Sequence, residues 1–217
     1  MTQIEELTRT VQIGPRRLEG FLAVPEGAAG LVIFAHGSGS SRFSPRNTYV
    51  AERLQNHGMG TLLFDLLTPE EASDRANVFD IALLGRRVAE AVRWARGEES
   101  LNALRIGLFG ASTGAAAALV GAAEMPEDVA AVVSRGGRPD LAGDYLCRVR
   151  APTLLIVGGL DYGVIELNEQ AFDAMTCEKR LDIVPGATHL FEERGALGKV
   201  VEKTAHWFET WLGASKS

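Results

Sequence analysis

Short, nearly continuous apolar runs alternate along the chain with longer segments whose apolar residues recur at helical spacing. A continuous apolar run is typical of a strand that is buried on both faces, as in a parallel sheet covered by helices. The predicted buried strands are residues 31–35, 61–64, 105–109, 129–133, 153–157 and 181–184. The predicted helices are residues 45–57, 78–96, 113–124, 164–175 and 195–212.

The N-terminal part of the chain has a different pattern. Residues 5–11 and 16–24 alternate between apolar and polar around Gly14-Pro15, which predicts an antiparallel hairpin at a sheet edge. Strands that then alternate with helices predict an α/β fold with a mostly parallel sheet and helices on both faces. No repeat or linker is apparent, so we expect one domain over residues 1–217. The longest irregular stretch, residues 136–152, is too short for a cap domain, although a short helix there would lie at the rim of the site.

Composition narrows the classes of function. Of the 217 residues, 46% are hydrophobic and the net charge is −6, which fits a soluble globular protein and argues against a nucleic-acid partner. No apolar window is long enough for a membrane helix, and residues 1–6 lack the features of a secretory signal. Cys147 and Cys177 form neither a disulfide framework nor a metal motif, so we expect free thiols in a reducing cytoplasm. The four scattered histidines contain no His-x-x-x-His pair, so neither a metal nor another cofactor is expected.

The strongest candidate for chemistry is residues 110–114, Gly-Ala-Ser-Thr-Gly, between a predicted strand and an alanine-rich helix. A serine at such a sharp turn projects its hydroxyl above the sheet edge, and the flanking glycines avoid a steric clash. The amides at the start of the helix favour negative charge nearby. Ser112 is therefore predicted to be a nucleophile, although the pentapeptide alone fits a helix N-cap equally well.

Two further polar residues follow predicted strands at the same edge. Ligands of an open α/β sheet bind beyond the carboxyl ends of its strands, and Asp161 and His189 come directly after the last two. Ser112, Asp161 and His189 occur in the chain order expected of a catalytic triad on this architecture. His189 would be the general base and Asp161 would orient its ring. The alternatives are a helix-capping loop histidine at 189, an N-cap aspartate at 161, and Asp173 or Asp182 as the acidic member.

The residues after the first buried strand, His36-Gly37-Ser38-Gly39, suggest an oxyanion loop. Two backbone amides usually stabilise the negative charge that develops on the carbonyl oxygen of an ester. We assign these amides to Ser38 and Thr113, because Thr113 follows the predicted nucleophile. His36 is expected to hold the loop by hydrogen bonds rather than to take part in the reaction.

Taken together, these motifs resemble the α/β-hydrolase superfamily, specifically small serine hydrolases of the dienelactone-hydrolase-like group. The resemblance extends from residue 36 to residue 189 and beyond, over nearly the whole chain. It implies an eight-stranded, mostly parallel sheet without a cap domain and a triad of Ser112, His189 and Asp161. Dienelactone hydrolases use a cysteine nucleophile where this chain has Ser112, so their lactone substrate is not implied, whereas hydrolysis of an ester-like bond is.

Several arginines are expected near this edge. Arg135 and Arg138 follow a predicted strand, and Arg42 and Arg46 follow the oxyanion loop. Arginine pairs bidentately with carboxylate or phosphate, so one or more of them could recognise an acidic group on the substrate. The alternative is that they form salt bridges to carboxylates of this acidic chain.

The sequence therefore predicts a cytoplasmic serine hydrolase acting on a small ester, lactone or thioester, as a monomer or homodimer. A non-catalytic binding or regulatory protein with the same fold is the alternative. Residues 107–114 superficially resemble a nucleotide-binding glycine loop. A dehydrogenase is disfavoured because this stretch lies mid-chain, no Tyr-x-x-x-Lys pair occurs, and no acidic residue ends a strand about 20 positions later.

Overall fold

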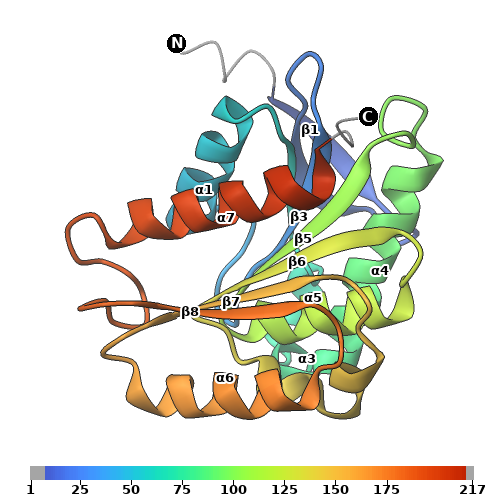
Figure 1. Cartoon of the computed structure of the whole chain (residues 1–217). Coiled ribbons are helices and arrows are strands. Elements are labelled where there is room, and N and C mark those ends of the chain that lie inside the picture. The colour runs from blue at the N-terminus through green and yellow to red at the C-terminus, as the bar shows by residue number, and fades with distance from the viewer. Residues whose placement is uncertain (1–7, 214–217) are drawn as a thin grey trace.

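The computed structural model describes residues 8–213 as an eight-stranded sheet in the order β1-β2-β4-β3-β5-β6-β7-β8 (Figure 1). The six strands β4, β3, β5, β6, β7 and β8 are parallel to one another. At the other end of the sheet, β1 pairs antiparallel with β2 and β2 pairs antiparallel with β4. The strands are Thr8–Ile13 (β1), Leu18–Ala23 (β2), Gly30–Ala35 (β3), Gly60–Phe64 (β4), Arg105–Ala111 (β5), Val129–Arg135 (β6), Thr153–Gly158 (β7) and Lys179–Val184 (β8).

The N-terminal hairpin is confirmed, with shifted bounds. Its strands are β1 and β2, joined by a turn in which the amide of Arg17 donates to the carbonyl of Gly14 at 3.0 Å. Residues 5–7 of the first predicted strand lie outside the described residues. The hairpin adds to the sheet beside β4, so it covers the edge of the parallel part.

The buried central strands confirm the prediction from the apolar runs. Every residue of β3, β4 and β7 is buried, because helices cover the sheet on both faces. The outer strand β8 alternates between exposed and buried positions. Its buried Asp182 pairs with Arg180 on the same strand and with Lys203 on the last helix.

Helices occupy both faces of the sheet (Figure 1). One face carries α1 and α7, and the other carries α4, α5 and α6. Two separate groups of buried apolar side chains lie on these two faces. The helices are Pro45–Asn56 (α1), Pro69–Ser73 (α2), Arg75–Phe79 (α3), Ile81–Gly97 (α4), Thr113–Glu124 (α5), Tyr162–Ala174 (α6) and Ala196–Leu212 (α7), and Pro139–Arg148 forms a kinked 3₁₀ segment (η1) at the expected place.

The predicted helix over residues 78–96 is wrong at its N-terminal end. The structure ends α3 at Phe79 and starts α4 at Ile81, with Asp80 between them in a non-helical conformation. The Asp80 carboxylate accepts a hydrogen bond from the amide of Leu83 at 2.9 Å, which caps a new helix. The preceding helix α2 was not predicted, although Thr68 and Glu71 form a capping box that marks its start.

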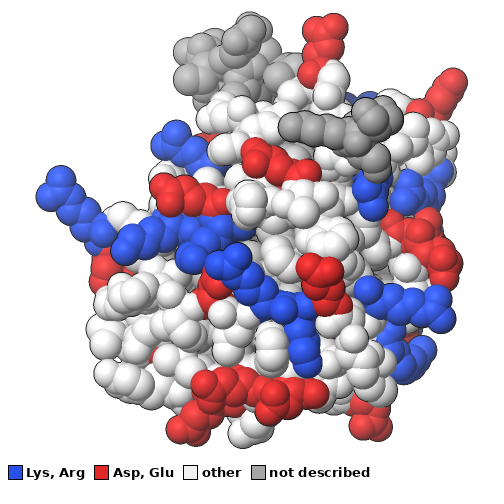
Figure 2. Space-filling view, in the orientation of Figure 1, with Lys and Arg blue, Asp and Glu red and all other residues white. Residues whose placement is uncertain are grey.

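The outer surface is mixed in charge. On the face shown in Figure 2, basic side chains cross the region of α7 and β8 between groups of acidic ones. None of the helices within residues 8–213 is both long and apolar enough to cross a membrane.

Candidate active site

Ser112 lies at the turn between β5 and α5 with φ 51° and ψ −126°. A non-glycine residue rarely adopts this conformation, and such strain is concentrated at functional sites. The backbone is held on two sides, since the Ser112 amide donates to the carbonyl of Arg135 at 3.3 Å and its carbonyl accepts from the amide of Arg138 at 3.0 Å. The side chain makes no capping hydrogen bond. Ser112 therefore occupies the N-cap position of α5 without capping the helix through its side chain, and within the described residues its half-buried hydroxyl makes no hydrogen bond.

Two glycines allow this turn to pack against its neighbours. A Cβ at Gly114 would lie 2.2 Å from the carbonyl oxygen of Ala35, at the end of β3. A Cβ at Gly110 would lie 2.4 Å from the Cα of Ala115 in the first turn of α5. Both positions require the absence of a side chain, as the pattern around Ser112 predicts.

Asp161 and His189 are joined in the structure. His189 Nδ1 lies 2.7 Å from Asp161 Oδ2, and the carboxylate makes no capping bond to α6. Because a carboxylate accepts hydrogen bonds, this contact favours the tautomer of the neutral ring that carries its proton on Nδ1 and has its lone pair on Nε2. The alternative that Asp161 caps a helix is therefore wrong. Of its rivals, Asp182 is engaged by Arg180 and Lys203, and Asp173 is exposed on α6.

The segment around Gly136 separates Ser112 from His189. A Cβ built at Gly136 would lie 3.8 Å from His189 Cε1, and its neighbours Arg135 and Arg138 bind the Ser112 backbone. Within residues 8–213 no hydrogen bond joins the Ser112 hydroxyl to the His189 ring. In hydrolases without substrate this contact is often long and tightens only in the substrate complex. Asp161 and His189 are thus in direct contact, whereas Ser112 is connected to His189 through the segment of residues 135–138, which contacts both.

The oxyanion loop lies directly against Ser112. A Cβ at Gly37 would lie 3.0 Å from the Ser112 Cβ and 3.7 Å from its Oγ, so glycine is needed for this approach. The Ser38 amide donates to Thr113 Oγ1 at 2.8 Å. The prediction that Ser38 offers a free backbone amide is therefore corrected, because a side chain of the nucleophile turn already accepts from it.

His36 holds this loop to the next strand end, as expected. Its Nε2 accepts from the amide of Leu66 at 3.1 Å, and Nδ1 lies 3.0 Å from the carbonyl oxygen of Gly37. Burial lowers the pKa of His36 below its ordinary value despite opposing effects of the Gly37 carbonyl and Asp65. A neutral ring with its proton on Nδ1 satisfies both bonds.

Two of the predicted anion-binding arginines are neutralised within the chain. Arg42 pairs with Asp65 and Glu19, and Arg138 makes a bidentate pair with Asp140 at 2.8 and 2.9 Å. The alternative of internal salt bridges is the correct one for Arg42 and Arg138, because carboxylates close by already occupy their guanidinium groups. Arg46 lies 3.6 Å from the exposed carboxylate of Glu192.

Arg135 differs from these arginines. Its side chain is buried, its Nη2 donates to Asn47 Oδ1 at 3.3 Å, and its Nε has no partner within the described part of the chain. Its guanidinium lies over the ring of Phe191, with the centroid 6.0 Å away. Burial and the like charge of Arg46 lower the pKa of Arg135 to about 10, so the group remains charged at neutral pH.

Sequence reasoning missed one part of the site. A cavity of about 290 Å³ adjoins the oxyanion loop, and α2 and α3 contribute Pro69, Ala72 and Val78 to its wall. Thr68-Pro69-Glu70-Glu71 carries a helix-start signal that could have located α2. Its position beside the loop could not be predicted, since it depends on contacts with α4.

Comparison with known proteins agrees with this geometry. A profile of the Dienelactone hydrolase family matches residues 18–212. The chain belongs to the dienelactone hydrolase family. A solved dienelactone hydrolase from Anabaena variabilis is 54% identical, with a TM-score of 0.90 over 94% of this chain and 96% of that one. These matches establish the α/β-hydrolase fold together with the family.

Structures of lower identity and relatives of greater length say less about the function of this chain. Est1E from Butyrivibrio proteoclasticus superposes with a TM-score of 0.78 at 16% identity, covering 94% of this chain and 98% of that one, which shows the fold alone. Two Mycobacterium tuberculosis proteins, each named "Putative phosphoribosyl transferase", are 57% identical over 198 residues. That match covers 91% of this family member but only 45% of the relatives, so the chain spans about half of their length.

Proposed function

We propose that this chain is a serine hydrolase that cleaves a small ester, lactone or thioester through an acyl-enzyme intermediate. The observation that carries the proposal is the 2.7 Å contact between His189 Nδ1 and Asp161 Oδ2. It fixes a ring whose free Nε2 can act as a base at the sheet edge where a strained turn exposes Ser112. The oriented base and the uncapped hydroxyl are the two parts that this chemistry needs.

The reaction would proceed in two balanced steps. Ser112 Oγ forms a bond to the carbonyl carbon while its proton passes to His189 Nε2, and the departing alkoxide or thiolate takes that proton as the acyl–oxygen or acyl–sulfur bond breaks. Water then attacks the acyl-serine and gives its proton to His189. The acid is released, and the proton returns to Ser112.

The comparisons support hydrolysis as the reaction class. The family and the Anabaena variabilis protein are named as dienelactone hydrolases, and Est1E is among the structural neighbours. We do not propose phosphoribosyl transfer for this chain, because it spans 45% of the relatives with that name and its site supports hydrolysis.

Active-site labelling tests the proposal directly. A fluorophosphonate should phosphonylate Ser112 with loss of fluoride, and mass spectrometry of peptides should locate the adduct. In parallel, short p-nitrophenyl esters, thioesters and lactones should identify the bond that is cleaved. An unlabelled Ser112 together with no turnover of any of these compounds would favour the non-catalytic binding or regulatory alternative.

The oxyanion would be stabilised mainly by Thr113. Its amide lies at the start of α5, and its 7% exposed side chain accepts from Ser38. Within residues 8–213 the Thr113 hydroxyl has no acceptor for its own proton. A hydroxyl that accepts one hydrogen bond is a better donor in the next. We therefore assign the second donor to Thr113 Oγ1 in place of the Ser38 amide.

Thr113→Val should lower kcat about 100-fold with little change in KM, because one donor to the transition state is lost. Thr113→Ser keeps the hydroxyl and should stay close to wild type. Steady-state kinetics on one p-nitrophenyl ester measures both variants, with thermal unfolding as a check on folding. If Thr113→Val instead turns over as fast as wild type, the hydroxyl masks the Ser38 amide and is not itself a donor.

Arg135 would recognise an acidic group on the substrate. A buried guanidinium without a carboxylate partner has lost hydration that the contacts with Asn47 and Phe191 replace only in part, and an anion would offset that cost. The proposal is supported by the position of Arg135 at the end of β6, where its backbone carbonyl accepts a hydrogen bond from the Ser112 amide.

Arg135→Gln should therefore lower kcat/KM for esters that carry a carboxylate or phosphate about 10-fold more than for neutral esters of the same size. The ratio between the two substrates is independent of how much enzyme is folded. Arg138→Gln is the matched control, since Asp140 already neutralises Arg138. Equal losses on both esters would mean that Arg135 is only structural.

A further inference from the structure

The cavity beside the oxyanion loop is apolar on the side opposite that loop. Its wall there consists of residues that follow β4 or belong to α2, α3 and α4, namely Leu66, Leu67, Pro69, Ala72, Val78 and Leu84. Its two titratable members, His36 and Asp65, are already engaged by Leu66 and Arg42, and its other polar members are the uncharged serines of the oxyanion loop. At about 290 Å³ the cavity is at the small end of ligand sites. It offers burial to a small apolar group and no free charge.

The order of the strands decides which part of an ester reaches this cavity. The cavity lies at the ends of β3 and β4, Ser112 follows β5, and Asp161 and His189 follow β7 and β8. The leaving group must take its proton from His189, so it lies toward β7 and β8. The acyl group extends from the carbonyl carbon in the opposite direction, toward the ends of β3 and β4. Gly37 links the two regions, because it lines the cavity and lies against Ser112.

We propose that this cavity is the acyl-binding site and that the substrate carries an uncharged aliphatic acyl group of short to medium length. This inference rests on the proposed hydrolase function and specifies its substrate class. The apolar wall gains from burial of each methylene group, whereas a charged acyl group would lose its hydration without a partner.

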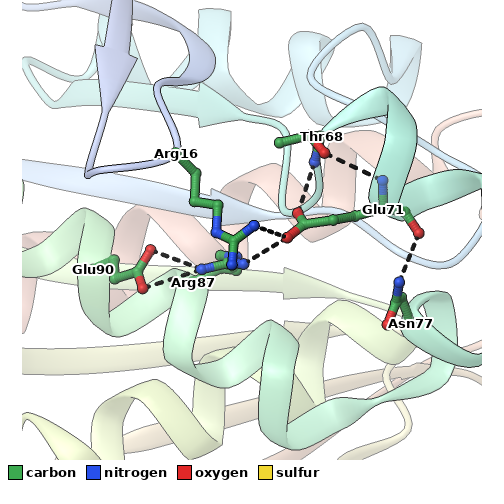
Figure 3. Close-up of polar contacts among 6 residues, drawn as sticks. All are labelled: Arg16, Thr68, Glu71, Asn77, Arg87 and Glu90. Atoms are coloured by element: carbon green, nitrogen blue, oxygen red, sulfur yellow. Dashed lines mark hydrogen bonds and ion pairs between the residues drawn. The ribbon is translucent and has the colours of Figure 1, made fainter.

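A charge network fixes the size of the cavity by holding α2 against α4 (Figure 3). The carboxylate of Glu71 accepts from the Thr68 amide at 3.0 Å and lies 2.9 Å from both Arg87 and Arg16. Arg87 is buried and also pairs with Glu90 at 3.1 Å. The α2–α3 segment is tied in as well, since Asn77 Nδ2 donates to the carbonyl of Glu71 at 2.9 Å.

The carboxylate of Glu71 at the centre of this network remains charged at neutral pH. Burial raises the pKa of Glu71, but the Thr68 amide and the charges of Arg87 and Arg16 outweigh it, so the pKa lies below its ordinary value. These contacts hold the wall of α2 and α3, whose own residues are not buried, against α4. A wall held in this way would set an upper limit on acyl length.

Substitutions at Val78, a half-buried residue of α3 in the wall, test the assignment. With p-nitrophenyl esters from acetate to dodecanoate, Val78→Phe should lower kcat/KM for hexanoate about 10-fold while leaving acetate within about 2-fold. Val78→Ala should shift the optimum to longer chains. Ala76→Phe, at an exposed position of the same helix outside the cavity, is the matched control.

Two further measurements separate the possible outcomes. In a series of acetate esters with lengthening alcohols, Val78→Phe should follow wild type at every length; a shift in this series instead of the acyl series would overturn the acyl assignment. Hexanoate binding to Ser112→Ala, measured by calorimetry, should weaken about 10-fold when Val78→Phe is added. If Val78→Phe leaves the affinity for hexanoate unchanged, the cavity is not the acyl-binding site, even where the wild-type enzyme hydrolyses the esters. No turnover by wild type would instead count against the hydrolase function.

Discussion

Ser112→Ala should lower kcat about a million-fold, to the level of the residual catalysis that binding and the oxyanion site provide. The physical reason is that the proposed acyl bond forms on the Ser112 hydroxyl, which alanine lacks. End-point or steady-state assays on the ester of the panel with the highest kcat/KM measure the loss of kcat. Labelling by a fluorophosphonate should disappear in the same variant.

Ser100→Ala is the matched control for this variant. Ser100 is exposed and lies before β5, at the opposite edge of the sheet from Ser112. It should keep wild-type turnover and labelling. If Ser112→Ala retains more than a trace of activity while remaining folded, the nucleophile lies elsewhere and the proposed triad fails.

Asp161→Asn should lower kcat about ten-thousand-fold with KM nearly unchanged. An amide in this place can donate to Nδ1, which favours the tautomer with its proton on Nε2 and leaves no base facing Ser112. The 2.7 Å contact with His189 is the observation on which this expectation rests. Kinetics on the same ester, with circular dichroism as a check on folding, would measure it.

Two other aspartates serve as controls. Asp173→Asn, on the exposed side of α6, should have no effect on kcat. Asp182→Asn removes pairs with Arg180 and Lys203 and should reduce thermal stability while leaving kcat unchanged. A large loss of kcat in either control, with Asp161→Asn fully active, would reassign the acidic member.

Together, the two proposals about substrate describe one molecule. An apolar acyl group would occupy the cavity at the ends of β3 and β4, and an acidic group would lie toward Arg135 at the end of β6. Ser112 lies between these places in the order of the strands. An ester that joins an aliphatic acid to an anionic alcohol or thiol is the compound class that fits both.

The sequence by itself determined the mostly parallel sheet, the sharp turn at Ser112 and the contact between Asp161 and His189. Strands buried on both faces leave continuous apolar runs, and the carboxyl ends of parallel strands meet at one edge, so residues following those runs can be predicted to lie together. The glycines around Ser112 are equally local signals, because backbone packing at a turn excludes a Cβ whatever the rest of the chain does.

Only the tertiary structure decided the partners of the charged and polar groups. Arg42 meets Asp65 and Glu19, each 23 residues away, and the Ser38 amide meets a hydroxyl 75 residues later. Arg135 meets Asn47 in place of a carboxylate, and α2 closes a cavity by contacts to Arg87. Such contacts depend on distances across the sheet edge, which no local pattern of residues encodes, because a side chain pairs with whatever group the fold brings within reach.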